Sequence, residues 1–173
     1  MQFRIKQGKG LRGEITLPGD KSISHRAIML ASLAEGKSEI CGLLEGEDCL
    51  ATIKVFQKMG VNISKQKGKF VVEGKGLKGL KDPSSPLDFG NSGTSVRLCS
   101  GVLAAQEFSS TLIGDSSLSS RPMTRITEPL GLMGANTSST ERGTLPIRIE
   151  PVDSLKSIKY SLPVASAQVK SCL

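Results

Sequence analysis

Apolar residues recur at helical spacing in two stretches near the start of the chain. Within residues 24–34 they occupy positions 27, 28, 30, 31, 33 and 34, which form one face of a helix. Gly36 follows and predicts the end of that helix, because glycine readily adopts the left-handed conformation found after helix C-termini. Asp48 is a suitable N-cap for a second helix that continues to Lys58. The pattern therefore predicts two amphipathic helices.

Shorter patterns around these helices predict strands. Ser38–Leu43 fits a short strand between the two helices. Gly60 is expected to end the second helix, and VNISKQ and KFVVEG then alternate around a Lys-Gly-Lys turn, as in a hairpin. Residues 1–13 also predict a strand segment. The repeated order of elements is interpreted as strand, helix, strand, helix, strand, strand (βαβαββ).

The same pattern occurs twice in the sequence. The segment Ile53–Gly74 aligns with Ile126–Ile149, and the preceding helix and strand also have counterparts. The chain therefore uses a unit of about 70 residues twice. The matched positions, 70 to 74 residues apart, are Arg26 with Arg97, Leu33 and Ala34 with Leu103 and Ala104, Ile40 with Leu112, Met59 and Gly60 with Met133 and Gly134, and Asn62 with Asn136.

A third copy begins at the end of the chain. The segment SLPVASAQVKSCL resembles the opening of the first two units, and it stops inside a predicted helix. We therefore expect the chain to be a truncated fragment of a longer protein. The predicted organisation is an N-terminal strand segment (1–13), a first βαβαββ unit (14–82), a second unit (83–155) and the truncated start of a third (156–173).

Three polar junctions lead into the predicted helices: PGDKSISHR, DFGNSGTSVR and PVASAQVK. Helix N-termini present unpaired N–H groups and partial positive charge, so hydroxyls and a basic residue there suit a carboxylate or phosphate. One junction alone could be ordinary capping. Three at equivalent positions predict helix starts that converge on an anion. Arg121, in the serine-rich segment 114–125, is a further candidate because its planar fork suits such ligands.

The charge is positive and unevenly distributed. Lys and Arg number 23 against 16 Asp and Glu, which gives a net charge of +7, and eight lysines lie between Lys54 and Lys81. Such a patch can bind nucleic acid. However, single-strand binders also need aromatic platforms, and this segment offers only Phe56 and Phe70. We expect a solvated basic face that attracts small anions, with a nucleic-acid-binding module as an alternative.

The remaining composition indicates an intracellular protein. The four cysteines include no C-x-x-C pair and the chain has one histidine, so we expect free thiols in a reducing compartment and no metal site. No segment approaches the ~20 apolar residues of a membrane span. The start MQFRIKQGKG lacks the apolar region of a secretory signal. A cytoplasmic location is therefore expected.

Five segments together resemble the N-terminal part of the 5-enolpyruvylshikimate-3-phosphate synthases (3-phosphoshikimate 1-carboxyvinyltransferases). They are LPGDKSISHRAIMLASLAEG, LLEGEDCLAT, LDFGNSGTSVRL, GDSSLSSRPM and PVASAQVKS, in the family's order and spacing. The likeness covers essentially the whole chain and is most specific in P-G-D-K-S-x-S-H-R and G-N-x-G-T. The related transferases that act on UDP-N-acetylglucosamine share the architecture but carry Lys-Asn in the opening motif, and they are the alternative.

The resemblance implies an α/β (α+β) fold and a reaction. The fold would be two lobes of three βαβαββ units around a pseudo-threefold axis. This chain would be the truncated first lobe, and residues 1–13 would associate with the second. The enzyme would transfer the enolpyruvyl group of phosphoenolpyruvate to the 5-hydroxyl of shikimate 3-phosphate, releasing phosphate. It implies no metal, no organic cofactor, no nucleic-acid or membrane partner, and a monomeric full-length enzyme. Since the family's general base lies beyond residue 173, the isolated chain is expected to be inactive.

The resemblance also implies the roles of individual residues. Lys21 would be catalytic through its charge and would contact both substrates. The residues implied for shikimate 3-phosphate are Lys21, Ser22, Arg26, Ser166, Ala167 and Gln168, and those for phosphoenolpyruvate are Lys21, Gly93, Arg121 and Gln168, with Asn91 as a weaker candidate. His25 is expected to be structural, and Arg97 to support its loop.

The sequence departs from the family pattern at two positions. Leu98 stands where many members have proline, and Ala167 replaces a common second serine, so that only backbone atoms can contact a ligand there. Gly93 keeps the small residue associated with glyphosate sensitivity, but the change at Leu98 leaves that sensitivity open.

Overall fold

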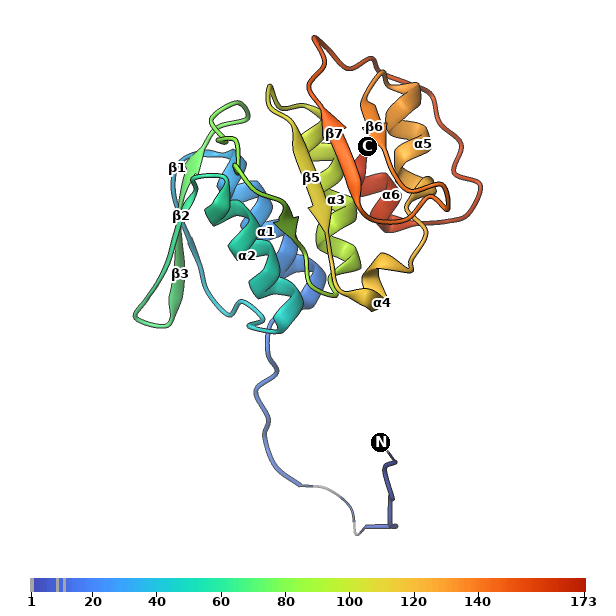
Figure 1. The fold of residues 1–173 in the computed structure, drawn as a ribbon. Helices are drawn as coiled ribbons and strands as arrows, with labels where there is room; N and C mark the ends of the chain where they lie inside the picture. Colours follow the sequence, from blue (N-terminus) through green and yellow to red (C-terminus); the bar gives the residue numbers. More distant parts are fainter. Residues whose placement is uncertain (1, 9, 11) are drawn as a thin grey trace.

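The computed structural model describes residues 2–8, 10 and 12–173, and within these residues two small sheets alternate with helices (Figure 1). The helices are α1 (Lys21–Leu33), α2 (Glu47–Lys58), α3 (Gly93–Ala104), α4 (Ser116–Ser119), α5 (Thr124–Leu132) and α6 (Ala167–Cys172). The strands are β1 (Glu35–Ile40), β2 (Asn62–Gln66), β3 (Lys69–Lys75), β4 (Leu87–Asp88), β5 (Ser110–Ile113), β6 (Asn136–Ser138) and β7 (Ile147–Glu150).

The first sheet has the order β1-β3-β2 and is antiparallel throughout. The predicted hairpin is confirmed as β2 and β3. Its two turn residues, Lys67 and Gly68, have φ values of 48° and 79°, as expected for the left-handed turn that matches the twist of paired strands. Phe70 and Val72 of β3 point to the same face and belong to the buried core, so the central strand supplies apolar side chains to that core.

The second sheet has the order β4-β5-β7-β6, in which β4 is parallel to β5 and the other pairs are antiparallel. The order β5-β7-β6 repeats the order β1-β3-β2 of the first sheet, so the two units share one topology. The second unit contains the full βαβαββ order with the short helix α4 added. The α/β fold of repeated units is therefore confirmed.

The strand expected in residues 1–13 is not formed by the described part of that segment. Residues 2–8, 10 and 12–20 contain no strand, and Figure 1 shows the segment extending away from the two sheets. The side chains of Phe3 and Ile5 are 85% and 92% exposed. An extended backbone becomes a strand only when another strand pairs with it. Among the described residues no strand lies beside this segment, so its apolar pattern alone was not sufficient to form a strand.

The internal repeat is preserved in the details of the fold. Met59 and Met133 are the C-caps of α2 and α5, and Gly60 and Gly134 follow with φ values of 85° and 92°. The carbonyl oxygens of the two methionines accept hydrogen bonds from equivalent later segments, at 2.9 and 2.7 Å. The predicted end of the second helix at Gly60 is thus confirmed. Glycine is favoured at both positions because their positive φ is strained for other residues.

Three predicted boundaries were wrong. Helix α1 ends at Leu33, and Gly36 lies inside β1 rather than capping the helix. The strand expected at 38–43 begins earlier, because pairing with β3 starts opposite Lys75. Gly46 is the N-cap of α2, and Asp48 lies one residue inside the helix. Pairing of Glu35 with Lys75 accounts for the boundary between α1 and β1.

Helices α1, α2 and α3 form the centre of the core with the inner faces of the sheets. The largest fully buried side chains include Phe56, Phe89, Ile28 and Met59. The four cysteines are free, as expected. Burial raises the pKa of the Cys172 thiol to about 12, so this thiol stays protonated and unreactive. Among the described residues no helix has the length and apolar character needed to cross a bilayer.

The contact between β3 and the end of α1 predicts a sharp difference between two glycine substitutions. A Cβ atom added at Gly74 would lie 2.1 Å from the Ala34 oxygen and 2.4 Å from the Ala31 oxygen, both in the backbone, whereas one added at Gly131 meets nothing within 4 Å. We expect Gly74→Ala to lower the free energy of unfolding by ~1–3 kcal/mol. Gly131→Ala should raise it by about 0.5–1 kcal/mol, because helix-interior glycine is disfavoured. Urea denaturation measures both; equal effects would contradict the packing described.

Candidate anion-binding site

The three predicted junctions are the starts of helices α1, α3 and α6. Each is capped by a side-chain oxygen that accepts a hydrogen bond from a backbone N–H three residues later: Asp20 at 2.7 Å, and Ser92 and Ser166 both at 3.3 Å. The caps satisfy only part of the free N–H groups at each helix start. The remaining groups keep these ends suitable for an anion.

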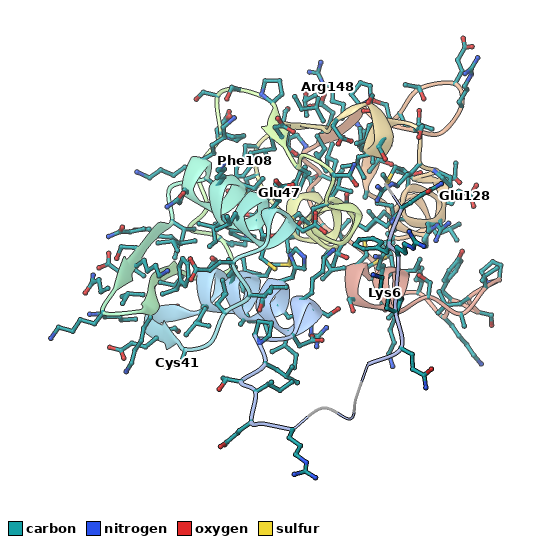
Figure 2. The ribbon with its side chains drawn as sticks, turned by 90° about the horizontal axis from the view of Figure 1, so that it is seen from below. Lys6, Cys41, Glu47, Phe108, Glu128 and Arg148 are labelled. Atoms are coloured by element: carbon teal, nitrogen blue, oxygen red, sulfur yellow. The ribbon has the colours of Figure 1, made fainter. Side chains whose placement is uncertain are left out.

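The three helix starts lie at the same end of the molecule. Figure 2 looks down the axis of α3, with α1 and α2 on one side and α5 and α6 on the other. Near their starts, Gln168 Nε2 of α6 donates to Thr94 Oγ1 of α3 at 3.2 Å. Further along, a Cβ atom on Gly101 would lie 1.9 Å from the Cys172 oxygen, so α6 runs along α3 in the same direction. His25 of α1 contacts Ser95 in the first turn of α3. The positive ends of these helix dipoles therefore converge.

Two arginines approach the first residue of α3. A Cβ atom on Gly93 would lie 3.0 Å from Arg97 Nη1 and 3.1 Å from Arg121 Nη1, so the absence of a side chain lets both guanidinium groups approach. Arg121 is held by Asn91, whose backbone oxygen accepts at 3.4 Å and whose Oδ1 accepts a second hydrogen bond. Asn91 Nδ2 in turn donates to Asp115 at 2.7 Å. The result is a cationic surface at the start of α3.

Arg97 is buried behind this surface. Its Nη1 donates to Gln168 Oε1 at 2.8 Å, and its Nη2 donates to the Pro122 oxygen at 3.3 Å. Burial lowers the pKa of Arg97, and the nearby positive charges of Arg125 and Arg121 lower it further. Arg97 thus does more than support its loop: it links the α3 start to Gln168.

Lys21 lies at the start of α1, beside the start of α2. Its ammonium group forms an ion pair with Asp48, and the side chains are 52% and 24% exposed. The Asp48 backbone oxygen accepts a hydrogen bond from Ser95 Oγ at 3.4 Å. Lys21 is therefore connected to the start of α3 through Asp48 of α2.

His25 joins three helices in the interior. Its Nδ1 lies 2.7 Å from Thr52 Oγ1 of α2 and 3.2 Å from Ser95 Oγ of α3, and the two hydroxyl oxygens are 2.5 Å apart. The other ring nitrogen is buried and has no partner among the described residues. Burial lowers the pKa of His25; the negative charge of Asp48 partly opposes this shift, and the positive charge of Lys21 adds to it. The contacts agree with the structural role expected for this histidine, but they satisfy only one of its nitrogens.

The structure groups some candidates and leaves others apart. Gly93, Asn91, Arg121 and Gln168 lie together around the start of α3, and Lys21 lies beside them across Asp48. Ser22 and Arg26 are exposed on α1, and Ala167 is exposed at the start of α6. The Ser166 hydroxyl is used as the α6 cap. Sequence reasoning did not identify Arg97 or Thr94 as partners of Gln168, although the repeated spacing of Arg26, Arg97 and Lys170 was a usable signal.

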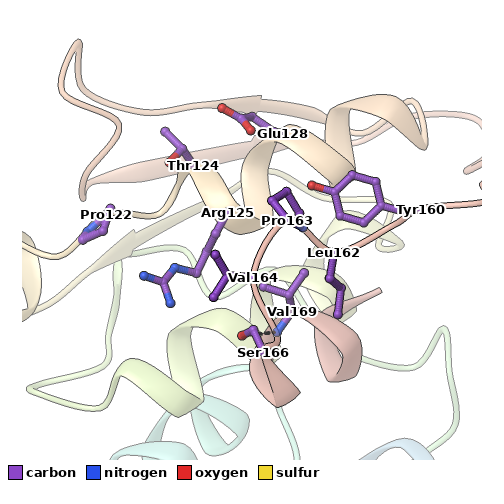
Figure 3. A pocket seen from close by; sticks show the side chains of 10 residues that line it. All are labelled: Pro122, Thr124, Arg125, Glu128, Tyr160, Leu162, Pro163, Val164, Ser166 and Val169. Carbon is purple, nitrogen blue, oxygen red and sulfur yellow. Dashed lines mark hydrogen bonds between the residues drawn. The ribbon is translucent and has the colours of Figure 1, made fainter.

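Two cavities border the cationic surface. A cavity of about 340 Å³ lies between α5 and the segment 160–166, and its walls are largely apolar (Figure 3). The Arg125 and Ser166 side chains also line it. A second hollow, of about 560 Å³, lies beside α2 and is lined by Asp48, Asp88 and Asp115 among others. Neither is lined by Lys21, Arg121 or Gln168, although Asn91, Lys54 and Lys58 also line the second.

The lysine-rich segment does not form a nucleic-acid platform. Lys65, Lys69 and Lys78 make ion pairs with Glu45, Glu39 and Glu107, which neutralises part of the positive charge. Both aromatic side chains of this segment are buried, at 0% exposure for Phe56 and 7% for Phe70. Bases cannot stack on buried rings. The segment therefore lacks the exposed aromatic rings that a nucleic-acid-binding module would need.

Comparison with known proteins identifies the family. The family described as EPSP synthase (3-phosphoshikimate 1-carboxyvinyltransferase) matches residues 5–173. The 3-phosphoshikimate 1-carboxyvinyltransferases of Hydrogenovibrio crunogenus and Methylococcus capsulatus are 55% and 57% identical over 100% and 99% of this chain. The chain spans 39% of the length of each. A solved structure of EPSP synthase from Acinetobacter baumannii is 55% identical with a TM-score of 0.89, and the match covers 92% of this chain and 37% of that one.

The fold and the comparisons agree. Repeated α/β units whose helix starts and basic side chains gather at one end define a single lobe of an α/β protein. The chain belongs to the EPSP synthase family, and it corresponds to the N-terminal part of its relatives' length.

The buried histidine predicts a specific pH dependence of stability. Since the pKa of His25 in the folded state is below its ordinary value of 6.5, the unfolded chain binds a proton first as the pH falls. The histidine's contribution is therefore present above pH 6.5 and is lost below it. We expect the difference in free energy of unfolding between the wild type and His25→Asn to shrink by up to about 1.4 kcal/mol per pH unit between pH 6.5 and the folded pKa.

Denaturation series at several pH values measure this difference, and subtracting the variant removes the contribution of carboxylates. The chain has one histidine, so its imidazole resonance can be followed without overlap. A difference in stability that is independent of pH, or a resonance that titrates near 6.5, would contradict a buried neutral ring.

Proposed function

We propose that this chain supplies the shikimate 3-phosphate side of the active site in a 3-phosphoshikimate 1-carboxyvinyltransferase. The observation that carries the proposal is the convergence of the α1, α3 and α6 starts with the Arg97–Arg121 pair at Gly93. Membership of the EPSP synthase family indicates which anions would bind there. Both proposed substrates are phosphorylated carboxylates, and dipoles and cations held in place before the reaction are what such ligands require.

The proposed reaction joins two anions and releases a third. The methylene carbon of phosphoenolpyruvate gains a proton, and the 5-hydroxyl oxygen of shikimate 3-phosphate bonds to the neighbouring carbon as it loses its proton. Departure of phosphate, with loss of a proton from the methyl group, restores the double bond. The contribution of this chain is to hold the reactants together and stabilise their charge, which lowers the entropic and electrostatic parts of the barrier.

The residues divide between the two substrates by position. Gly93 and Arg121 would bind phosphoenolpyruvate at the start of α3, where guanidinium groups can approach its charged oxygens. Ser22 and Arg26, exposed on α1, would bind shikimate 3-phosphate, and the exposed Arg26 fork suits its carboxylate. The α6 start would complete this side through Ser166, Ala167 and Gln168, with Gln168 also reaching phosphoenolpyruvate. Asn91 would act by holding Arg121.

Lys21 would act electrostatically on both substrates. Its ammonium group is half exposed at the start of α1, and its ion pair with Asp48 keeps it beside the α2 and α3 starts. An exposed ion pair of this kind is weak, so an anionic substrate can compete for the ammonium group. We propose that Lys21 stabilises negative charge near the reacting 5-hydroxyl oxygen.

The proposal includes an enzyme that needs neither metal nor organic cofactor and acts as a cytoplasmic monomer. The alternative substrate is UDP-N-acetylglucosamine, used by the related transferases. Ser22 argues against it, since the opening motif here is Lys-Ser rather than Lys-Asn.

The proposed role of Lys21 can be tested in a chimaeric enzyme. The chain replaces the matching part of the Acinetobacter baumannii EPSP synthase, which is 55% identical, and Lys21→Met is compared with the matched control Lys37→Met on the exposed start of β1. Loss of one electrostatic stabiliser should lower kcat roughly 100-fold or more, whereas the control should not change it. Phosphate release gives the rates. An active chimaera whose turnover is unaffected by Lys21→Met would refute the role.

Gly93→Ala should weaken binding of phosphoenolpyruvate in the same chimaera. The added methyl group would lie 3.0 and 3.1 Å from the two guanidinium tips, so both must move away from the start of α3. We expect the KM for phosphoenolpyruvate to rise roughly tenfold, since small displacements at a binding site are costly, and the KM for shikimate 3-phosphate to change less. Equal changes in both KM values would contradict the assignment of Gly93 to phosphoenolpyruvate.

A further inference from the structure

Arg97 occupies a repeated position whose three copies have different surroundings. Its counterparts are Arg26 on α1, 71 residues earlier, and Lys170 on α6, 73 residues later, and both are exposed. Arg97 is only 6% exposed, because α6 packs along α3. A guanidinium that loses its hydration is costly to bury unless it gains hydrogen bonds and a counter-charge. The enclosure of this copy therefore needs an explanation.

The hydrogen bonds of Arg97 supply no counter-charge. It donates to two neutral oxygens, Gln168 Oε1 at 2.8 Å and the Pro122 carbonyl at 3.3 Å, while its Nε has no partner among the described residues. The ion pairs of the described residues do not include it. Its charged neighbours are Arg121 and Arg125. The positive charge is thus left uncompensated next to Gly93.

The contact with Arg97 determines which way the Gln168 amide points. A guanidinium can only donate hydrogen bonds, so the amide atom that faces Arg97 must be the oxygen. The amide nitrogen then faces the start of α3, where one N–H donates to Thr94 Oγ1 at 3.2 Å. The second N–H has no partner among the described residues. Without Arg97 nothing would prevent the amide from turning over and presenting its oxygen instead.

We infer that Arg97 is a positioning residue: it holds the Gln168 amide so that its N–H groups, and not its oxygen, face an anionic ligand between α3 and α6. The inference rests on the proposed function, because it takes shikimate 3-phosphate and phosphoenolpyruvate as the ligands. It goes further by separating the two roles. Gln168 contacts the ligand, while Arg97 acts through Gln168 and adds positive charge from behind.

A double-mutant cycle tests this on the 173-residue chain. Arg97→Met removes the donors and keeps an unbranched apolar chain, Arg97→Lys keeps a charge with a single donor group, and Lys170→Met is the control at the equivalent exposed position. Each change is made with and without Gln168→Ala. Titration with shikimate 3-phosphate, followed by NMR, gives the dissociation constants. The side-chain amide resonances of Gln168, assigned by their loss in Gln168→Ala, report the orientation of the amide, and the amide fingerprint verifies the fold.

Arg97→Met should weaken shikimate 3-phosphate binding roughly tenfold, as expected for mispairing at a charged hydrogen bond, and should shift the Gln168 amide resonances. Arg97→Lys should restore part of both, and Lys170→Met should leave both unchanged. In the Gln168→Ala background the effect of Arg97→Met should fall below twofold. If the wild type binds but Arg97→Met binds equally well, or if its effect persists without Gln168, the inference fails and the proposed function stands. If the wild type does not bind shikimate 3-phosphate, both fail together.

Discussion

The parallel packing of α3 and α6 is the constraint on which the candidate site depends. The close approach of Gly101 to the Cys172 backbone allows the helices to lie side by side with their starts at one end. That packing brings Gln168 to Thr94 and encloses Arg97. It also places like charges and the positive ends of helix dipoles together, which is electrostatically unfavourable until an anion binds. The close packing of Gly101 against Cys172 thus brings positive charge together at the helix starts, where a bound anion would be favourable.

The helix starts on the other side of α3 are packed together without a buried positive charge. Between α1, α2 and α3 the contacts are made by neutral groups, with His25, Thr52 and Ser95 forming a buried cluster. Hydroxyl groups can both donate and accept, so they accommodate a neutral imidazole without a charge. Ser95 and Gln168 occupy equivalent positions in successive repeats, and each contacts a helix of the preceding unit. Their partners are not equivalent, since the counterpart of Arg97 is Arg26 and not His25, so the first interface is neutral and the second is cationic.

The two interfaces use buried polar groups for different purposes. A buried neutral cluster rigidifies the junction of the helices, whereas an uncompensated buried cation favours a bound anion. Proteins tend to break the rules of stable packing where they bind ligands. Arg97 breaks such a rule and His25 largely does not, although both were expected to be structural. The apolar hollow at Arg125 and the acidic hollow at Asp48 show that cavity size alone would have directed attention away from the basic cluster.

The sequence by itself determined the family, the helices, the hairpin and the repeat. These depend on local periodicity, on turn residues such as Gly60, and on motifs whose order survives without any knowledge of contacts. It also indicated that the three helix starts would gather, since equivalent positions in repeated units point the same way. Only the tertiary structure decided that residues 2–8 form no strand, that Asp48 pairs with Lys21 instead of capping α2, and that Arg97 orients Gln168. A strand, an ion pair and a buried charge each need a partner distant in the chain, and the sequence pattern carries no information about which partner arrives there.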